Sequence, residues 1–217
     1  MSSRGLFITV EGGEGVGKST NMTFLQNELS GHGVELVLTR EPGGSQLGED
    51  IRQLLLQVTE EQVCPMAELL LIFAARAQHI NDLVEPALAA GKWVLCDRFT
   101  DATYAYQSGG RGIDHKTVAA LENLVQGPLR PDYTIFLDAP VDTGMARARG
   151  RGELDRFEQE ELAFFERIRA TYLQLAEHSS GRYRLIDASQ PLAKVQQQLL
   201  KVCSELVACW GVRHPAS

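Results

Sequence analysis

The segment that most constrains the fold of this 217-residue chain is the octapeptide Gly12–Ser19, with the sequence GGEGVGKS. It matches the phosphate-binding pattern G-x-x-x-x-G-K-[ST] at every fixed position. The run Leu6–Val10 before it is short, apolar and β-branched, as expected of a buried strand. After it, Phe24, Leu25 and Leu29 recur at helical spacing. This strand–loop–helix unit predicts an α/β fold in which backbone N–H groups and a helix start hold the phosphates of a nucleoside triphosphate.

Two side chains of this loop have defined roles in such a motif. Lys18 is expected to reach the β- and γ-phosphates, and the Ser19 hydroxyl is expected to ligate Mg²⁺. The alternative, a glycine-rich turn without a ligand, leaves the flanking strand and helix unexplained. The residues predicted to bind the nucleotide are Gly12, Gly13, Glu14, Gly15, Val16, Gly17, Lys18, Ser19 and Thr20.

Apolar runs and helical patterns alternate along the rest of the chain. Strands are expected at Leu6–Val10, Glu35–Thr39, Trp93–Asp97, Tyr133–Asp138 and Tyr183–Asp187. Helices are expected at Ser19–Ser30, Gly48–Leu56, Met66–Ala89, Lys116–Val125, Val141–Arg149, Glu160–His178 and Ala193–Cys209. This alternation predicts a parallel sheet covered by helices on both faces, a three-layer P-loop NTPase sandwich. We expect a single domain over 1–217, with its ligands at the carboxyl ends of the strands.

The longest expected helix, Met66–Ala89, has an unusually broad apolar stripe. Pro86 is expected to kink or loosen its last turn. Most of the stripe is interpreted as packing on the core, and a subunit contact on part of it is the alternative.

Composition restricts the partners and the location of the protein. A net charge of −7 and a pI near 5.3 argue against a general nucleic-acid-binding surface. The four cysteines form no C-x-x-C pair, which argues against a zinc site and favours a reducing, cytoplasmic compartment. The sequence has no charged-then-apolar leader and no apolar run of about 18 residues, so no membrane association is expected.

A second group of polar residues follows the expected strand Trp93–Asp97. Asp97 at the end of that strand could hold Mg²⁺ through water, and the adjacent Arg98 could grip a phosphoryl group with two hydrogen bonds. The alternative is a structural ion pair between the two.

In their joint order, these and further motifs resemble the thymidylate kinase family. The segments that carry the resemblance are Glu11–Thr20, Thr39–Gly44, Phe73 with Arg76, Asp97–Phe99, Tyr104–Gln107, Gly110–Gly112 and Arg147–Glu158. The resemblance implies that ATP phosphorylates dTMP to dTDP with Mg²⁺. It also implies a five-stranded parallel sheet, a homodimer and a mobile lid at about 147–158.

The resemblance gives two residues of the long helix a role in base binding. Phe73 resembles the ring that stacks on thymine, and Arg76 resembles the donor to a base carbonyl. Their separation of three residues places both on one helical face. From periodicity alone Phe73 reads as a core residue, whereas a buried Arg76 without a partner would be costly.

The resemblance also assigns the remaining residues of the acceptor pocket. Arg98 resembles the group that binds the acceptor phosphate, and Thr103 and Gln107 resemble base contacts. Tyr106 resembles the aromatic ring that crowds the 2′ position of the sugar. The pair Glu41-Pro42 resembles the turn beside the sugar and phosphate. Taken alone, the tyrosine reads as an ordinary half-buried residue and the glutamine as an exposed one.

The predicted lid combines arginines with glycines that could act as hinges. Its residues are Arg147, Arg149, Gly150, Arg151, Gly152 and Arg156. Because Glu14 puts an acidic residue in the phosphate loop, the chain resembles the bacterial members of the family, whose lid supplies the catalytic charge. We expect that role for Arg151, with Arg149 second. On charge pattern alone, the segment reads as a solvated basic helix end.

The expected reaction is in-line transfer of the γ-phosphoryl group to a phosphate oxygen that is already ionised, so no strong general base is required. Catalysis then depends on positioning and on the charges of Lys18, Mg²⁺, Arg98 and the lid arginine. Another nucleoside monophosphate or small acceptor remains an alternative substrate. A nucleotide-dependent switch is a rival of another class, but a GTP switch would need an N-K-x-D segment, which the sequence lacks.

Overall fold

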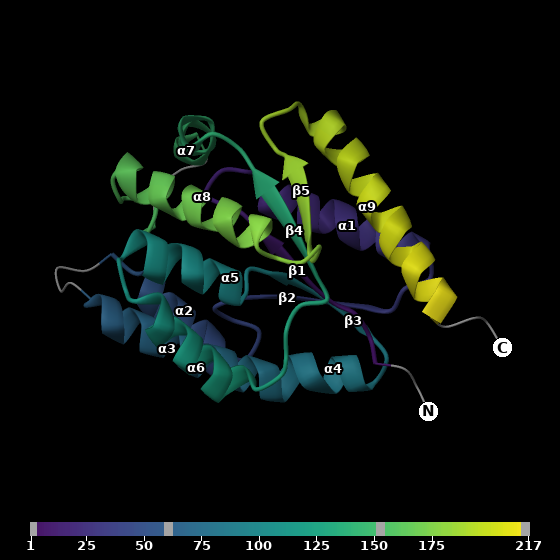
Figure 1. The fold of residues 1–217 in the computed structure, drawn as a ribbon, viewed down its shortest axis with the longest axis horizontal. Helices are drawn as coiled ribbons and strands as arrows, with labels where there is room; N and C mark the ends of the chain where they lie inside the picture. Colours follow the sequence, from purple (N-terminus) through teal and green to yellow (C-terminus); the bar gives the residue numbers. More distant parts are fainter. Residues whose placement is uncertain (1–3, 59–62, 151–154, 214–217) are drawn as a thin grey trace.

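The computed structural model describes residues 4–58, 63–150 and 155–213, and these contain one five-stranded sheet (Figure 1). Its strands are β1 (Phe7–Glu11), β2 (Leu36–Arg40), β3 (Trp93–Asp97), β4 (Tyr133–Asp138) and β5 (Tyr183–Asp187). They run parallel in the order β2-β3-β1-β4-β5. The register places Val10 beside Asp97 and Glu11 beside Phe136, so the strands end together at one edge. This architecture confirms the predicted α/β fold class.

Side chains alternate across the sheet and divide the core into two layers. Ile8 and Val10 of β1 face one helical layer, and Phe7 faces the other. The first layer consists of α1 (Lys18–Gly31) and α9 (Leu192–Arg213). Figure 1 shows α9 on one side of the sheet and α3, α4 and α6 on the other. Where α9 meets the amino end of β3, Trp210 packs edge-to-face on Trp93, with ring centroids 5.4 Å apart.

The opposite layer carries most of the residues that resemble an acceptor site. Its main elements are α2 (Gln46–Leu56), α3 (Pro65–His79), α4 (Glu85–Ala89), α5 (Thr100–Thr103), α6 (His115–Gln126) and α8 (Leu162–Glu177). Two π-helical turns, η1 (Ile80–Val84) and η2 (Tyr104–Gly110), and α7 (Val141–Arg149) complete the described helices. Among the described residues, no helix is long and apolar enough to cross a membrane.

Two helical segments differ from the sequence expectation. The expected helix Met66–Ala89 is divided into α3, η1 and α4, because Pro86 has no N–H to donate to the preceding turn and a widened turn lies just before it. The helical stretch Thr100–Gly110 was not expected. Thr100 to Gln107 are all buried, so the segment has no alternation of polar and apolar faces by which periodicity would reveal a helix.

Candidate active site

The phosphate loop joins β1 to α1 and has the backbone that its glycines predict. Several of them have positive φ, among them Gly15 at 68°. A Cβ on Gly15 would lie 1.8 Å from the carbonyl oxygen of Gly144, so only glycine fits this close approach. The Lys18 Nζ donates to the carbonyl oxygens of Gly12 at 3.1 Å and Gly13 at 2.8 Å. With the first turn of α1 directly behind it, the loop is built to receive anionic oxygens.

Electrostatics around Lys18 also suit an anionic ligand. Burial lowers the pKa of Lys18, and the nearby Arg98 lowers it further. The carboxylates of Glu14, Asp97 and Glu11 act in the opposite direction. Phosphate oxygens beside this ammonium group would favour its charged form in the same way.

Asp97 and Ser19 fit the requirements of a Mg²⁺ ion. Asp97 ends β3, and its Oδ1 is buried without a hydrogen-bond partner among the described residues. Ser19 lies in the first turn of α1, and both residues line one open groove beside the loop. Hydroxyl and carboxylate oxygens are ligands that Mg²⁺ prefers, and an unpaired buried carboxylate oxygen requires a partner.

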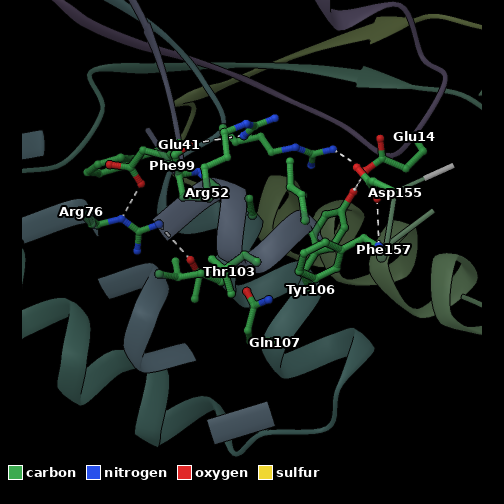
Figure 2. A pocket seen from close by; sticks show the side chains of 16 residues that line it. Glu14, Glu41, Arg52, Arg76, Phe99, Thr103, Tyr106, Gln107, Asp155 and Phe157 are labelled. Atoms are coloured by element: carbon green, nitrogen blue, oxygen red, sulfur yellow. Dashed lines mark hydrogen bonds and ion pairs between the residues drawn. The ribbon is translucent and has the colours of Figure 1, made fainter. Parts of the chain in front are cut away.

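A cavity lies beside the phosphate loop, enclosed by α2, α3, α5, η2 and the segment 155–157 (Figure 2). The structure brings eight predicted site residues together on its wall: Glu14, Glu41, Pro42, Arg76, Arg98, Thr103, Tyr106 and Gln107. The other wall residues were not predicted individually as site residues, although Asp155 and Phe157 lie in the predicted lid and Phe99 in a segment that carries the resemblance: Arg52, Leu55, Leu56, Ile72, Phe99, Ala102, Asp155 and Phe157.

The end of the cavity nearest the loop carries two guanidinium groups. Arg98 has a left-handed backbone with φ 68°, and its Nη1 donates to the Gly12 carbonyl at 2.9 Å. Its Nη2 donates to Glu14 Oε1 at 2.7 Å, and the Tyr106 hydroxyl donates to the same oxygen at 2.6 Å. Arg52 is the second: its Nη1 donates to the Pro42 carbonyl at 3.2 Å, and burial, together with Arg40 and the nearby Arg98, lowers its pKa. A phosphate that entered here would compete with Glu14 for Arg98.

The opposite end of the cavity is organised by Arg76, which is only 1% exposed. Its Nε donates to Glu41 Oε2 at 2.6 Å and its Nη2 to Thr103 Oγ1 at 2.9 Å (Figure 2). The guanidinium carbon lies 4.8 Å from the Phe73 ring centroid and 5.0 Å from that of Phe99. Its Nη1 is buried and has no partner among the described residues. An unpaired N–H of a buried charged group is costly, so the guanidinium group would gain by turning this nitrogen toward a ligand carbonyl.

The placement of Phe73 corrects the sequence expectation. Its ring is 2% exposed and packs with Leu69, Tyr104 and Val118, away from the cavity wall. The apolar side chain of α3 on that wall is Ile72, which lies one turn before Arg76. Successive helical residues point about 100° apart, so the two neighbours face different surroundings. Phe73 is therefore a core residue that supports the Arg76 guanidinium, and its predicted stacking on a base is not supported.

Arg52 and Glu68 were missed as site residues. Arg52 lies beside buried Ile51 and Leu55 in α2, and a charged residue next to an apolar stripe is the signal that could have found it. Glu68 lies behind the cavity wall, where its Oε1 accepts from Gln107 Nε2 at 2.9 Å. The sequence carries no local signal for that contact.

The structure separates the arginines of the predicted lid. Arg147 donates to the carbonyl oxygens of Ala188 at 2.9 Å and Ser189 at 3.3 Å, and Arg149 is exposed. Arg151 lies outside the described residues. Arg156 is held at the cavity edge, where its Nε donates to the Leu55 carbonyl and its Nη2 to Glu68. Arg156 therefore anchors the segment that follows the predicted hinge residues.

Glu11 is a fully buried carboxyl group at the end of β1. It accepts hydrogen bonds from the Phe99 N–H at 2.7 Å and the Tyr172 hydroxyl at 2.8 Å. Burial, together with Asp101, raises the pKa of Glu11 to about 8, against the opposing effect of Arg98. Burial is thus the main reason why this carboxyl group holds its proton to a higher pH than an ordinary glutamate.

Comparisons with known proteins agree on one family. The family model described as "Thymidylate kinase" matches residues 10–199. The "Thymidylate kinase" of Pseudomonas syringae pv. tomato is 58% identical over 203 residues, which cover 94% of this chain and 97% of that protein. The "Thymidylate kinase" of Teredinibacter turnerae is 57% identical over 195 residues, 90% of this chain and 95% of that one. The crystal structure of a thymidylate kinase from Ehrlichia chaffeensis aligns with a TM-score of 0.73 and 33% identity, covering 92% of this chain and 98% of the other.

Proposed function

This chain belongs to the thymidylate kinase family, and we propose that it transfers the γ-phosphoryl group of ATP to dTMP within the cavity beside its phosphate loop. The observation that carries this assignment is the polarity of the cavity. Arg98 and Arg52 lie toward the loop, and Arg76, whose guanidinium group has one unpaired N–H among the described residues, lies at the other end (Figure 2). This arrangement suits a nucleotide with its phosphate toward ATP and a base carbonyl against Arg76.

The donor side of the site is proposed to bind ATP with Mg²⁺. Residues 12–20 would surround the phosphates, and Lys18 would exchange its contacts with the loop carbonyls for phosphate oxygens. Ser19 and Asp97 would hold Mg²⁺, Asp97 through water, and the bound ion would supply charge neutralisation.

The acceptor side is proposed to bind dTMP along the cavity. Arg98 and Arg52 would hold its phosphate, with Glu14 displaced from Arg98 or turned toward the sugar. Tyr106 would lie beside the sugar, and Glu41-Pro42 would form the adjacent turn. The base would lie between Ile72 and the polar groups of Arg76, Thr103 and Gln107.

Phosphoryl transfer in this arrangement requires no general base, because the attacking phosphate oxygen is ionised at neutral pH. The chain contributes positioning and positive charge. We propose that 147–158 acts as a lid of a single domain, 1–217, and that Arg151 or Arg149 closes over ATP in the transition state.

We further propose a homodimer, supported by exposed apolar side chains on three neighbouring helices. Leu54 of α2, Met66 and Leu70 of α3 and Leu124 of α6 are 52%, 44%, 50% and 79% exposed. α3 contacts both α2 and α6, so these side chains lie on adjoining surfaces. Light scattering at micromolar concentration should give about twice the 23.9 kDa of one chain, and a monomer mass would refute the proposal. The four free cysteines support a reducing, cytoplasmic location.

An acceptor-dependence assay tests the proposed function. ADP formation from ATP should require an added monophosphate, with dTMP preferred among dTMP, dUMP, UMP, CMP, AMP and GMP. Lys18→Ala should abolish transfer without unfolding the protein, because its ammonium group contacts the loop that holds the phosphates. Turnover that ignores the acceptor, or a preference for another monophosphate, would contradict the assignment.

A further inference from the structure

Glu68 is a buried carboxylate for which the phosphoryl-transfer chemistry has no use. It lies in the first turn of α3 and is 0% exposed. Its Oε1 accepts from Gln107 Nε2 at 2.9 Å, and its Oε2 accepts from Arg156 Nη2 at 2.6 Å. Arg111 Nε lies 3.3 Å from Oε1. The carboxylate thus joins η2, the residue that follows η2 and the segment after the predicted lid hinge.

These contacts fix which end of the Gln107 amide faces the ligand. A carboxylate between two guanidinium groups can only accept hydrogen bonds, so the amide must turn its nitrogen toward Glu68. The amide oxygen is then the end available to the cavity, on whose wall Gln107 lies. In Figure 2 the oxygen of the labelled Gln107 side chain points toward the space between Arg76 and Tyr106.

Together, Arg76 and Gln107 present one donor and one acceptor to a bound base. With a base bound, the Arg76 guanidinium group would offer an N–H by turning its buried, unpaired Nη1 toward the base, and the Gln107 amide would offer an oxygen. Thymine complements this pair, because its C4 carbonyl accepts a hydrogen bond and its N3–H donates one. Cytosine presents an amino group and a ring lone pair at the same two positions, so both of its contacts would be mismatched.

We propose that Glu68 is a positioning residue that selects the imide edge of the acceptor base by fixing the orientation of the Gln107 amide. The proposal rests on the acceptor site proposed above. It assigns Glu68 no contact with the substrate and no part in the chemical step.

The test compares dTMP with 5-methyl-dCMP, which has the same sugar, phosphate and methyl group and differs only at the edge read by Arg76 and Gln107. Glu68→Gln keeps the shape of the side chain but introduces an N–H₂ group that can bond to the Gln107 oxygen. The amide can then turn its nitrogen toward the cavity. The preference for dTMP, measured as a ratio of dissociation constants by titration calorimetry, should fall about tenfold. This corresponds to about 1.4 kcal/mol in the difference between the two binding free energies.

Glu122→Gln is the matched control. Glu122 is also a largely buried carboxylate, 12% exposed, that forms an ion pair with Arg130 Nε at 2.7 Å and accepts a hydrogen bond from the Tyr104 hydroxyl, but it lies off the cavity wall. This variant should keep the ratio of the unaltered protein. If Glu68→Gln lowers the affinity for both nucleotides equally, the residue has a merely structural role and the proposal is overturned. An unchanged ratio with unchanged affinities would overturn it as well.

A second variant keeps the test decisive if Glu68→Gln does not fold. Glu68→Gln/Gln107→Glu exchanges the two groups, retains one carboxylate in the pair and again leaves an oxygen toward the base. It should retain the preference for dTMP, and equal affinity for the two nucleotides would overturn the proposal. Failure of the unaltered protein to bind dTMP would instead refute the proposed function, so the two failures are distinguishable.

Discussion

Replacing Arg76 with methionine tests the base end of the site most directly. The substitution keeps an unbranched apolar stem between the Phe73 and Phe99 rings, while removing every N–H of the guanidinium group. If the unpaired Nη1 binds a base carbonyl, the variant loses a charged hydrogen bond of about 1.5–3 kcal/mol. The KM for dTMP should then rise roughly tenfold to a hundredfold.

The same substitution has a separate effect on stability. Glu41 is 3% exposed and loses its bond to Arg76, keeping His79 Nδ1 at 2.9 Å as a partner. Breaking a buried ion pair from one side typically costs about 3–5 kcal/mol of unfolding free energy. Because the histidine contact is retained, we expect a cost near the lower end of this range. The double variant Arg76→Met/Glu41→Gln should recover part of the lost stability, because it leaves no buried carboxylate without its partner.

The assay measures KM for dTMP, KM for ATP and the urea unfolding midpoint of each variant. The KM for ATP should stay within about twofold, because Arg76 lies at the cavity end remote from the phosphate loop. Arg184→Met serves as the control, since it removes an arginine paired with Glu205 on α9, away from the cavity. A folded Arg76→Met protein with an unchanged KM for dTMP would refute the reasoning.

Three further predictions concern the core, the lid and pH. Phe73→Ala should lower the unfolding free energy by about 3–5 kcal/mol with little change in KM for dTMP, whereas Ile72→Ala should raise that KM. The opposite pattern would support stacking of Phe73 on the base. Replacing Arg149 and Arg151 together with alanine should reduce kcat far more than dTMP binding, and a kcat within about threefold would exclude lid arginines from catalysis. The pKa of Glu11, about 8 when folded, exceeds its ordinary value of 4.5, so its contribution to stability is complete below that value and is lost as pH rises through 8. The urea midpoint should therefore decrease between pH 5.5 and pH 8.5, and it should decrease less in Glu11→Gln than in the unaltered protein. An equal decrease in both proteins would contradict the raised pKa of Glu11.

The strands were predictable because their apolar runs are short and clearly bounded. Three of them have the predicted bounds, and β1 and β2 are displaced by a single residue. The break at η1 was harder to place, because Pro86 shows only that a hydrogen bond is missing and not which turn widens to accommodate it. Burial on all sides hid the helical stretch Thr100–Gly110.

Within the candidate site, motifs identified the charged groups better than the apolar ones. α3 is apolar over most of its circumference, so periodicity could not distinguish Ile72 from Phe73 as the cavity residue. The network around Glu68 depends on contacts with Gln107 and Arg156, which are 39 and 88 positions away. Contacts at that separation are set by tertiary packing, and no local pattern in one sequence encodes them.

The contact between Trp93 and Trp210 gives the protein a built-in optical probe. These are the two tryptophans of the chain, and they meet where α9 covers the amino end of β3. Because the substrate cavity lies at the carboxyl ends of the strands, intrinsic tryptophan emission should respond to detachment of α9 and be nearly silent when nucleotides bind. Fluorescence can therefore follow the docking of the last helix during refolding even with saturating substrates present.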